Sequence, residues 1–533
     1  MRNLKTFGHV LMAGTAALAL SACDGASSVA SPGEGTVVIP APAPAPTPTP
    51  TGTPTPAPGT PAASCPTGTN DGGIVGNYRA CRLPALLTGN VTLARLAGVA
   101  YEINGRVDVG VDAGGTGTGS TQTGILTIQP GVVLYANTTN TDNDFLIVNR
   151  GSRIAAEGTE TQPIIFTAQQ NLTGGVTDES QGLWGGVILA GRAPISNCNL
   201  AGVAGGAVNC ENVVEGTGNA LYGGATPTDT SGTFRYVQIR YSGTIISPNN
   251  ELQGLTLGGV GSGTTIDHVQ VHNSSDDGIE VFGGRVNMRY LAITGADDDG
   301  LDTDVGWQGF VQFVIAAQKP NNTQTDNYST EIDSNNAEDA LPRQNYRLAN
   351  FTFIDTSTAT NAAVRIRGGA DVTMVNGIIQ SNTPCLNIVA GETSATDKST
   401  IRPANAALQD NGPPVFNSVF FACTGALSTT TAVNGITVTT AEQDALVAAG
   451  SNNTPGGTAA NALQNGYFPT ATTLAVTPFN AATLNPSGTS FFVQTAFIGA
   501  VSGPNDTNFR GWTCNSNRAN FGTTSGACTG LPS

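Results

Sequence analysis

Hydrophobic and polar residues alternate along most of the chain, in short runs that Gly, Pro and Asn interrupt. Residues 124–136, 145–168 and 182–191 are three such runs, and each has the length of one or two strands. Successive side chains of a strand point to opposite faces, so alternation with a period of two predicts short strands separated by tight turns. The 68 Gly residues and the low aromatic content of 6% also favour strands over helices.

One segment has a helical pattern instead. Thr440 precedes residues 441–449, Gln443 follows it by three residues, and Gly450 comes directly after the segment. A hydroxyl before the first turn, an amide three residues later and a Gly at the end are start and stop signals of a helix. We therefore predict one short helix at 441–449, as an insertion or a lateral cover of the main repeat.

The sequence around residue 280 is repeated 22 residues later. The stretch DDGIE at 276–280 returns as DDGLD at 298–302. Repeats of this length, with strand-sized apolar runs and turn residues between them, are typical of a β-solenoid. An antiparallel sandwich or a propeller would not preserve the phase of the repeat residue by residue. We therefore predict an all-β fold, namely a right-handed parallel β-helix of about 22-residue coils with loop insertions.

The repeat also assigns side chains to faces, because equivalent residues of adjacent coils lie about 4.8 Å apart in neighbouring strands. The residues predicted to point inward are Leu255, Leu257, Ile279, Val281, Leu301, Thr303, Ile332, Val364 and Ile366. Their neighbours form two outward columns, which we expect to face solvent. These columns are Thr256, Glu280, Asp302, Glu331 and Arg365, and beside them Phe282, Asp304, Asp333 and Arg367.

Stacked carboxylates at this spacing repel each other by about 1 kcal/mol in water, and by several times more at a lower surface dielectric. Three devices offset such repulsion: the arginines at the end of the columns, a bound hard cation, or a shared proton. Calcium, with its preference for oxygen ligands, is the one cofactor that the sequence suggests. The predicted metal ligands are Asp276, Asp277, Asp298 and Asp299, with Glu280 and Asp302 close by. The alternative is that these aspartates only cap the turns between coils.

The same columns could also cleave polysaccharides. Paired carboxylates about 5 to 7 Å apart satisfy the geometry of a glycosidase, and acids that hold Ca²⁺ beside an arginine base satisfy that of a polysaccharide lyase. The catalytic candidates are Glu280, Asp302, Asp304, Glu331 and Arg365. The competing hypotheses for this face are a solvated ladder of ion pairs and a polymer-binding groove.

Charge excludes one class of partner. The chain carries 38 acidic and 22 basic residues, a formal net charge of -16. Nucleic acids require clustered Lys and Arg, so we expect no nucleic-acid partner.

The N-terminus predicts export. Residues 1–22 combine Arg2 and Lys5 with a short apolar run and end in Leu-Ser-Ala before Cys23, and this resembles a bacterial lipoprotein signal peptide whose Cys is acylated. Residues 23–63 alternate Pro with Ala and Thr, which predicts an extended linker, and residues 64–533 form the β-helix with a C-terminal capping segment. The predicted partner is thus a membrane, through the lipid anchor.

Eight further cysteines in an exported chain indicate disulfides. Their grouping suggests that neighbours pair, although the sequence alone leaves the connectivity open. The expected pairs are Cys65 with Cys81, Cys198 with Cys210, Cys385 with Cys423, and Cys514 with Cys528.

The chain also resembles a family of right-handed β-helix lipoproteins of Gram-negative bacteria. The segments that carry the likeness include IQPG at 128–131, LWGGVILAG at 183–191, the stretch from 247 to 284, and DDDGLDTDVGWQG at 297–309. The resemblance implies an exported lipoprotein at the outer membrane or cell surface, often found beside TonB-dependent receptors, and it assigns no catalytic residue. Polygalacturonases share the fold and segments similar to DDGI, but this chain lacks their Gly-His-Gly segment.

The function predicted from the sequence is that of a surface-anchored binding or accessory lipoprotein for a glycan or a similar extracellular polymer. A polysaccharide lyase or glycoside hydrolase is the first alternative, and a structural adhesin is the second.

Overall fold

The computed structural model describes most of the chain that follows the predicted linker. The described residues are 59–140, 143–247, 250–320, 322, 324–334, 338–391 and 397–532. The predicted signal peptide, Cys23 and most of the predicted linker lie outside them. Among the described residues, no helix combines the length and the apolar character that crossing a membrane requires.

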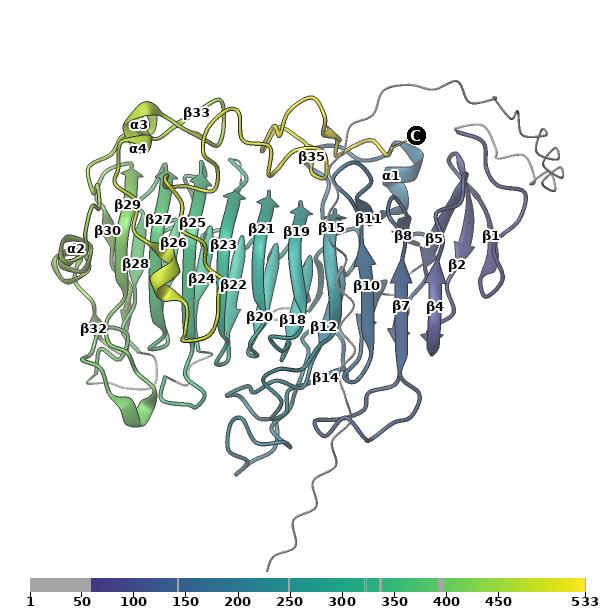
Figure 1. Cartoon of the computed structure of the whole chain (residues 1–533), viewed down its shortest axis with the longest axis horizontal. Helices are drawn as coiled ribbons and strands as arrows, with labels where there is room; N and C mark the ends of the chain where they lie inside the picture. Colours follow the sequence, from purple (N-terminus) through teal and green to yellow (C-terminus); the bar gives the residue numbers. More distant parts are fainter. Residues whose placement is uncertain are drawn as a thin grey trace, which may run out of the picture. The chain divides into compact units, whose positions relative to one another are not determined.

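Two long sheets form the body of the fold, and the chain passes from one to the other and back in every coil (Figure 1). We call the larger one sheet 1. Its strands, in spatial order, are β1 (Asn70–Val75), β2 (Tyr78–Arg82), β5 (Val99–Ile103), β8 (Val133–Ala136), β11 (Ile164–Ala168), β15 (Gly232–Arg240), β19 (Thr265–His272), β21 (Asn287–Thr294), β23 (Gln308–Ala317), β25 (Asn345–Asp355), β27 (Asp371–Ser381) and β29 (Val415–Cys423), with β4 (Gly89–Leu93), β7 (Gly124–Ile128) and β10 (Arg153–Glu157) alongside.

Sheet 2 contains the shorter strand of each coil. Its order is β3 (Leu86–Leu87), β6 (Arg106–Val109), β9 (Phe145–Val148), β12 (Val187–Ala190), β18 (Leu255–Gly258), β20 (Ile279–Phe282), β22 (Leu301–Asp304), β24 (Thr330–Ile332), β26 (Val364–Ile366), β28 (Leu386–Ile388) and β30 (Ser428–Thr429). From β18 to β30 the strands of the two sheets alternate along the chain, and neighbours within each sheet pair in parallel. This is a parallel β-helix, and the predicted fold class is confirmed.

Small elements decorate the coils. The two-stranded sheets are β13 (Asn212–Val213) with β14 (Leu221–Tyr222), β16 (Thr244–Ser247) with β17 (Asn250–Leu252), β31 (Ala432–Val433) with β32 (Ile436–Thr437), β33 (Leu463–Gln464) with β34 (Phe468–Pro469), and β35 (Cys514–Asn515) with β36 (Gly526–Ala527). The helices are α1 (Gln169–Thr173), α2 (Thr440–Ala449), α3 (Ala459–Ala462) and α4 (Ala471–Leu474), with 3-10 turns η1 (Ala406–Leu408) and η2 (Ala481–Leu484). The prediction of one short helix was therefore incomplete, because the other three are only four or five residues long and give no periodic signal.

Helix α2 begins one residue earlier than predicted. Its N-cap is Thr439, whose hydroxyl accepts from the backbone N–H of Glu442 while the Glu442 carboxylate accepts from Thr439. Gln443, predicted to complete the cap, instead binds the last coils: its Oε1 accepts from the N–H of Ile388 and its Nε2 donates to the carbonyl of Thr429. The helix therefore closes the C-terminal end of the solenoid.

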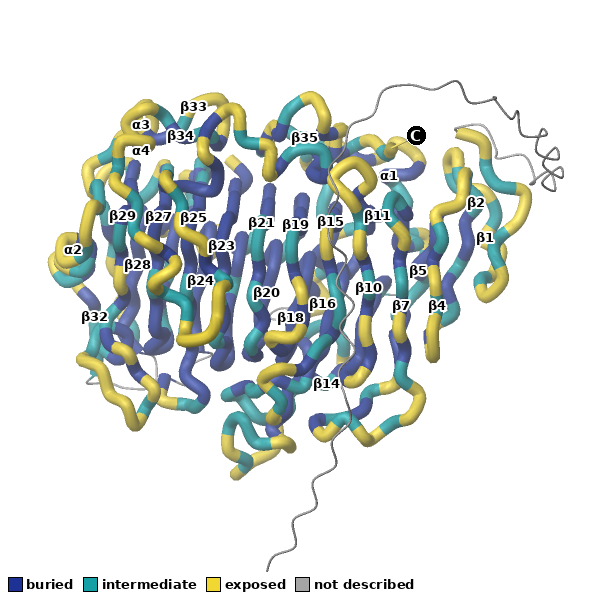
Figure 2. The backbone as a smooth tube through the Cα atoms, in the orientation of Figure 1, coloured by how far each residue is buried: buried dark blue, intermediate teal, exposed yellow. Residues whose placement is uncertain are grey.

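The interior of the coils is apolar, and all nine residues that were predicted to point inward are fully buried. Exposed residues gather on the loops and the outer strands, whereas the central strands are buried (Figure 2). The alternation of apolar and polar residues thus located the core correctly, because a one-residue slip would have reversed every face.

A bend that the sequence did not predict recurs in sheet 1. Strand β15 pairs with β10 along its first half and with β11 along its second half, and Tyr236 between them has a left-handed φ of 50°. His268, Tyr290 and Phe313 occupy the equivalent positions of the next three coils with φ between 54° and 67°. Their rings stack, with centroids 4.3 to 4.7 Å apart. Aromatic packing offsets the backbone cost of the bend.

The C-terminal segment packs on the outer face of sheet 1 (Figure 1). Side-chain amides of successive coils hold its backbone: Gln238 Nε2 donates to the carbonyl of Trp512 at 2.5 Å and Gln270 Nε2 to that of Cys514 at 3.0 Å. Arg240 donates to the carbonyls of Cys528 and Gly530, both at 2.7 Å. The last residues thus cover strands that precede them by more than two hundred positions.

The cysteine prediction is confirmed. The four disulfides join Cys65 to Cys81, Cys198 to Cys210, Cys385 to Cys423, and Cys514 to Cys528. The second of these closes a loop within the excursion between β12 and β15 (residues 191–231), which packs against the outer face of sheet 2.

Candidate functional site

The predicted carboxylate columns exist, and they run across sheet 2. Glu280 on β20 pairs directly with Asp302 on β22, Asp302 with Glu331 on β24, and Glu331 with Arg365 on β26. Thr256 on β18 precedes Glu280 in the same column. In the second column, Phe282 pairs with Asp304. The side chains of both columns point away from the apolar interior.

The columns do not face open solvent, however, and this part of the prediction was wrong. Glu280, Asp304 and Glu331 are only 7 to 8% exposed. The excursion between β12 and β15 packs on this face, and its Tyr222 ring packs against Phe282 with a centroid distance of 5.8 Å. No local pattern in the sequence predicts that this excursion folds back over the outer face of sheet 2.

Arginines neutralise one end of the columns. Arg367 Nε lies 2.9 Å from Glu331 Oε1 and Arg367 Nη2 lies 2.9 Å from Asp333. Arg365 Nε lies 3.3 Å from the same Glu331 oxygen. Burial acts to lower the pKa of Arg365, but Glu331 and Tyr328 outweigh it, so the pKa is raised and the group stays charged. The ladder of ion pairs that was one of the competing hypotheses is therefore present at this end.

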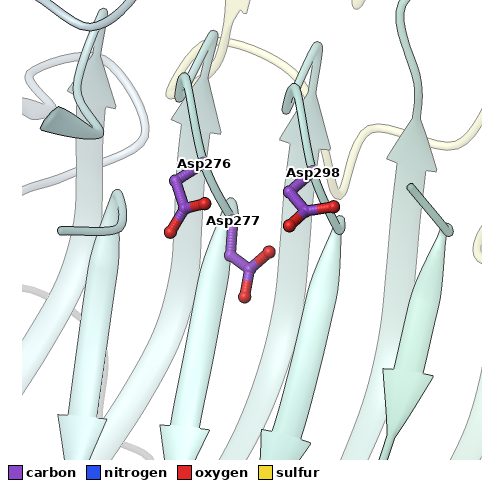
Figure 3. Close-up of side chains that lie close together, drawn as sticks. All are labelled: Asp276, Asp277 and Asp298. Atoms are coloured by element: carbon purple, nitrogen blue, oxygen red, sulfur yellow. The ribbon is translucent and has the colours of Figure 1, made fainter. Parts of the chain in front are cut away.

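At the other end of the columns, the described residues form no such ion pairs. Asp276, Asp277 and Asp298 each place a carboxylate oxygen within 4.8 Å of the others, and so do Asp277, Glu280 and Asp302. Figure 3 shows the first group, with Asp277 between Asp276 and Asp298 on the turns that lead into adjacent strands. Among the described residues, no basic side chain forms an ion pair with any of these five acids.

Few hydrogen-bond donors reach this acidic cluster, which consists of Asp276, Asp277, Asp298, Glu280 and Asp302. Asp277 Oδ1 accepts from the N–H of Asp299 at 2.8 Å, and Asp302 Oδ1 from the N–H of Thr303 at 2.5 Å. Gln253 Nε2 donates to Asp276 at 3.3 Å. Within the part of the chain that the structure describes, Glu280 receives no hydrogen bond. Most of these carboxylate oxygens therefore receive no hydrogen bond from the described residues.

Burial and mutual repulsion both favour the protonated forms. Burial, reinforced by the nearby Glu215, raises the pKa of Asp276 to about 7. Burial and Asp276 raise the pKa of Asp298 to about 8. The pKa values of Asp277, Glu280 and Asp302 are raised well above the ordinary range, first by burial and then by neighbouring carboxylates. A divalent cation would remove both penalties, since its charge and its coordination bonds favour the ionised forms.

Comparison with models of protein families identifies the family of this chain. The family model of the pectate-lyase-like β-helix domain matches residues 96–463, more than half of the chain and the whole of both columns. The chain belongs to this family. Searches of curated proteins and of solved structures found no match.

Asp277 and Asp299 occupy equivalent positions of the repeat, but only Asp277 belongs to the acidic cluster. Asp299 is the counterpart of Asp277, yet it belongs to neither group of close carboxylates, and its Oδ1 accepts from the N–H of Tyr328 at 2.5 Å. It is the one predicted metal ligand that the structure leaves outside the acidic cluster. Asp304 also lies outside, where its Oδ1 accepts from the N–H of Val305 at 2.6 Å.

Sequence reasoning missed Glu215. This residue lies in the loop between β13 and β14, its Oε1 accepts from the N–H of Glu251 at 2.9 Å, and it acts electrostatically on Asp276 and Glu280. Its position more than sixty residues before the acidic cluster gives no local signal. Contact between the excursion and the hairpin β16–β17 brings Glu215 close to the acidic cluster.

The two ends of the first column should respond oppositely to neutral substitution. Glu331→Gln leaves Arg365 and Arg367 without their shared acceptor, so we expect the free energy of unfolding to fall by about 3 kcal/mol. Glu280→Gln removes a repelling charge that has no partner, so in chelator we expect no loss or a gain. Urea unfolding of both variants at pH 7.5 measures the difference. Equal destabilisation by the two changes would contradict the division of the column.

Proposed function

We propose that this β-helix is a surface-displayed, non-catalytic polysaccharide-binding protein whose acidic cluster holds a divalent cation, with calcium as the expected ion. The observation that carries the proposal is a set of five close carboxylates without a basic partner among the described residues, on a face where the neighbouring acids do have arginines. Calcium takes about six to eight oxygens, so hydroxyl or carboxylate oxygens of a glycan would complete its shell. The family of the chain supports a carbohydrate-related role.

The proposed location is the outer membrane or cell surface. Acylation of Cys23 would provide the lipid anchor, and the Pro-rich residues 23–63 would hold the β-helix away from the membrane. Four disulfides fit an oxidising, extracytoplasmic compartment. An accessory role beside a TonB-dependent receptor fits this location and gives the bound polymer a route of uptake.

A panel of uronate-containing and neutral polysaccharides tests the proposal. We expect the purified protein to retain at least one of them on an affinity gel with 1 mM calcium present and to release it in chelator. Asp302→Asn should weaken retention about tenfold or more, because it removes a ligand of the ion, whereas Asp299→Asn should not. Retention that ignores both chelator and Asp302→Asn would refute the cation-dependent mode.

A hydrolase is the second candidate, and one observation favours it. Glu280 and Asp302 are direct neighbours with raised pKa values, and a protonated carboxyl beside a carboxylate is what general acid catalysis of glycoside cleavage requires. A lyase has less support, because Arg365 is held by Glu331 and Asp326 and cannot serve as a free base. New reducing ends that disappear in Glu280→Gln would establish the hydrolase. Binding without cleavage and without a cation would leave the structural adhesin.

A further inference from the structure

A second candidate site lies on the outer face of sheet 1, whereas the acidic cluster lies on sheet 2. A hollow of about 700 Å³ opens there above the first residues of β23 and β25. Phe310 and Arg347 form its floor as direct neighbours, and Gln308 with Asn345 form the row beside them. Its walls are provided by Ala404, Ala406, Gln409, Asp410, Asn411 and Pro486. The volume is in the range of pockets that bind small organic ligands.

The arginine in this hollow forms no ion pair with any residue that the structure describes. The guanidinium of Arg347 lies over the Phe310 ring, 5.2 Å from its centroid, and within the described ranges it forms no ion pair and no hydrogen bond. Burial lowers the pKa of Arg347, and Asp371 only partly opposes this effect. Stacking on a ring occupies the face of a guanidinium and leaves the N–H groups along its edge free to donate.

The acids nearest the hollow already form ion pairs with other arginines. Asp410 lies 2.7 Å from Arg402 Nε and 3.2 Å from Arg343 Nη2. Asp371 accepts from Asn411 Nδ2 at 2.7 Å and lies 3.5 Å from Arg343 Nε. Among the described residues, these carboxylates form their ion pairs with Arg343 and Arg402 and not with Arg347, on which Asp371 acts only electrostatically.

A second arginine, Arg289, lies close by and stacks on a neighbouring ring. Arg289 is stacked over Phe491 at 4.3 Å, and the Phe491 and Phe310 rings are 5.8 Å apart. Among the described residues, Arg289 also makes no ion pair, and its Nε has no hydrogen-bond partner. The two guanidinium groups thus flank one aromatic cluster. In a chain with a formal net charge of -16, both add positive potential to the same surface.

We propose that this hollow binds the carboxylate of a hydroxylated organic acid, either free or as one residue of a polymer. The edge of the Arg347 guanidinium would hold the carboxylate through two parallel hydrogen bonds, a geometry that arginine provides and lysine does not. The amides of Asn345 and Gln409, which line the hollow, would bind hydroxyl groups. The site needs no cation and so is independent of the acidic cluster.

Calorimetric titration of the full chain in chelator tests this site. D-glucuronate is the probe, and D-glucose, which lacks the carboxylate, is its uncharged counterpart. We expect glucuronate to bind and glucose not to bind. Arg347→Gln should weaken glucuronate binding at least tenfold, and Arg347→Lys should restore part of it, because the charge returns without the fork. Arg153→Gln is the matched control, since Arg153 is an exposed arginine on β10 that forms no ion pair with any described residue.

Two further ligands show whether the bound carboxylate belongs to a free acid or to one residue of a polymer. Tighter binding of a glucuronate-containing oligosaccharide than of the monomer supports the site and identifies a polymer residue as the ligand. Binding of malate, a free hydroxy acid, equal to that of glucuronate supports it and identifies a free acid. Absence of binding by all three acids, or equal losses in Arg347→Gln and Arg153→Gln with both variants folded by circular dichroism, would overturn the proposal.

Discussion

Asp277→Asn is expected to abolish the stabilisation that calcium gives the protein. Asp277 belongs to both groups of close carboxylates, so its loss removes one ligand from each. At a calcium concentration about a hundred times the dissociation constant, binding adds about 2.7 kcal/mol, which corresponds to a rise in Tm of roughly 3 °C for a domain of this size. We expect that rise in the parent protein and less than a third of it in the variant.

The same substitution should not harm the protein in chelator. Asparagine keeps the Oδ1 that accepts from the N–H of Asp299, and it removes a charge that is only 6% exposed and surrounded by other acids. In chelator we therefore expect a Tm equal to or above that of the parent. Asp299→Asn is the matched control, because Asp299 is as deeply buried but lies outside the acidic cluster. Equal loss of the calcium effect in both variants would contradict the assignment.

The second large effect is expected from pH. Asp276 and Asp298 have pKa values of about 7 and about 8 in the folded chain, against an ordinary value of 3.8. The folded protein therefore retains protons that the unfolded chain releases above about pH 4, and the free energy of unfolding falls as the pH rises through the folded-state values. From pH 5 to pH 8 in chelator we expect a loss of about 3 kcal/mol or more, measured by urea unfolding.

Calcium should reverse most of this trend, because the ion requires ionised ligands and binds more tightly as the pH rises. Asp355 allows the contributions to be separated: burial raises its pKa to about 7, and it lies outside the acidic cluster. Asp355→Asn should reduce the loss of stability between pH 5 and pH 8 equally with and without calcium. A free energy of unfolding that rises from pH 5 to pH 8 in chelator would mean that the clustered acids are already compensated.

The sequence predicted the coil and the columns because both follow from local periodicity. Repetition of DDGIE as DDGLD 22 residues later fixed the phase of neighbouring strands, and the observed pairing of Glu280 with Asp302 has that phase. Alternation within each strand then assigned Leu255 and Ile279 to the interior, where they are fully buried. These inferences needed no information from distant parts of the chain.

What covers the columns could not be predicted, because it depends on contacts far apart in the sequence. The excursion that contains Tyr222 and Glu215 folds back over sheet 2 and converts an expected open strip into a mostly buried one. Asp277 and Asp299 each accept from a backbone N–H of the next coil, which is that of Asp299 for Asp277 and that of Tyr328 for Asp299. Only Asp277 belongs to a group of close carboxylates, so similar sequence contexts gave two unlike sites.

The central claim is that a cation binds where the acids of the column lack arginines. Diffraction from crystals grown with calcium, or with a lanthanide in its place, tests this most directly through anomalous scattering. The account predicts an anomalous peak about 2.3 to 2.6 Å from a carboxylate oxygen of Asp277, with Asp276 and Asp298 or Glu280 and Asp302 completing the contacts. A map without a peak at this position, at millimolar metal and pH 8, would contradict it.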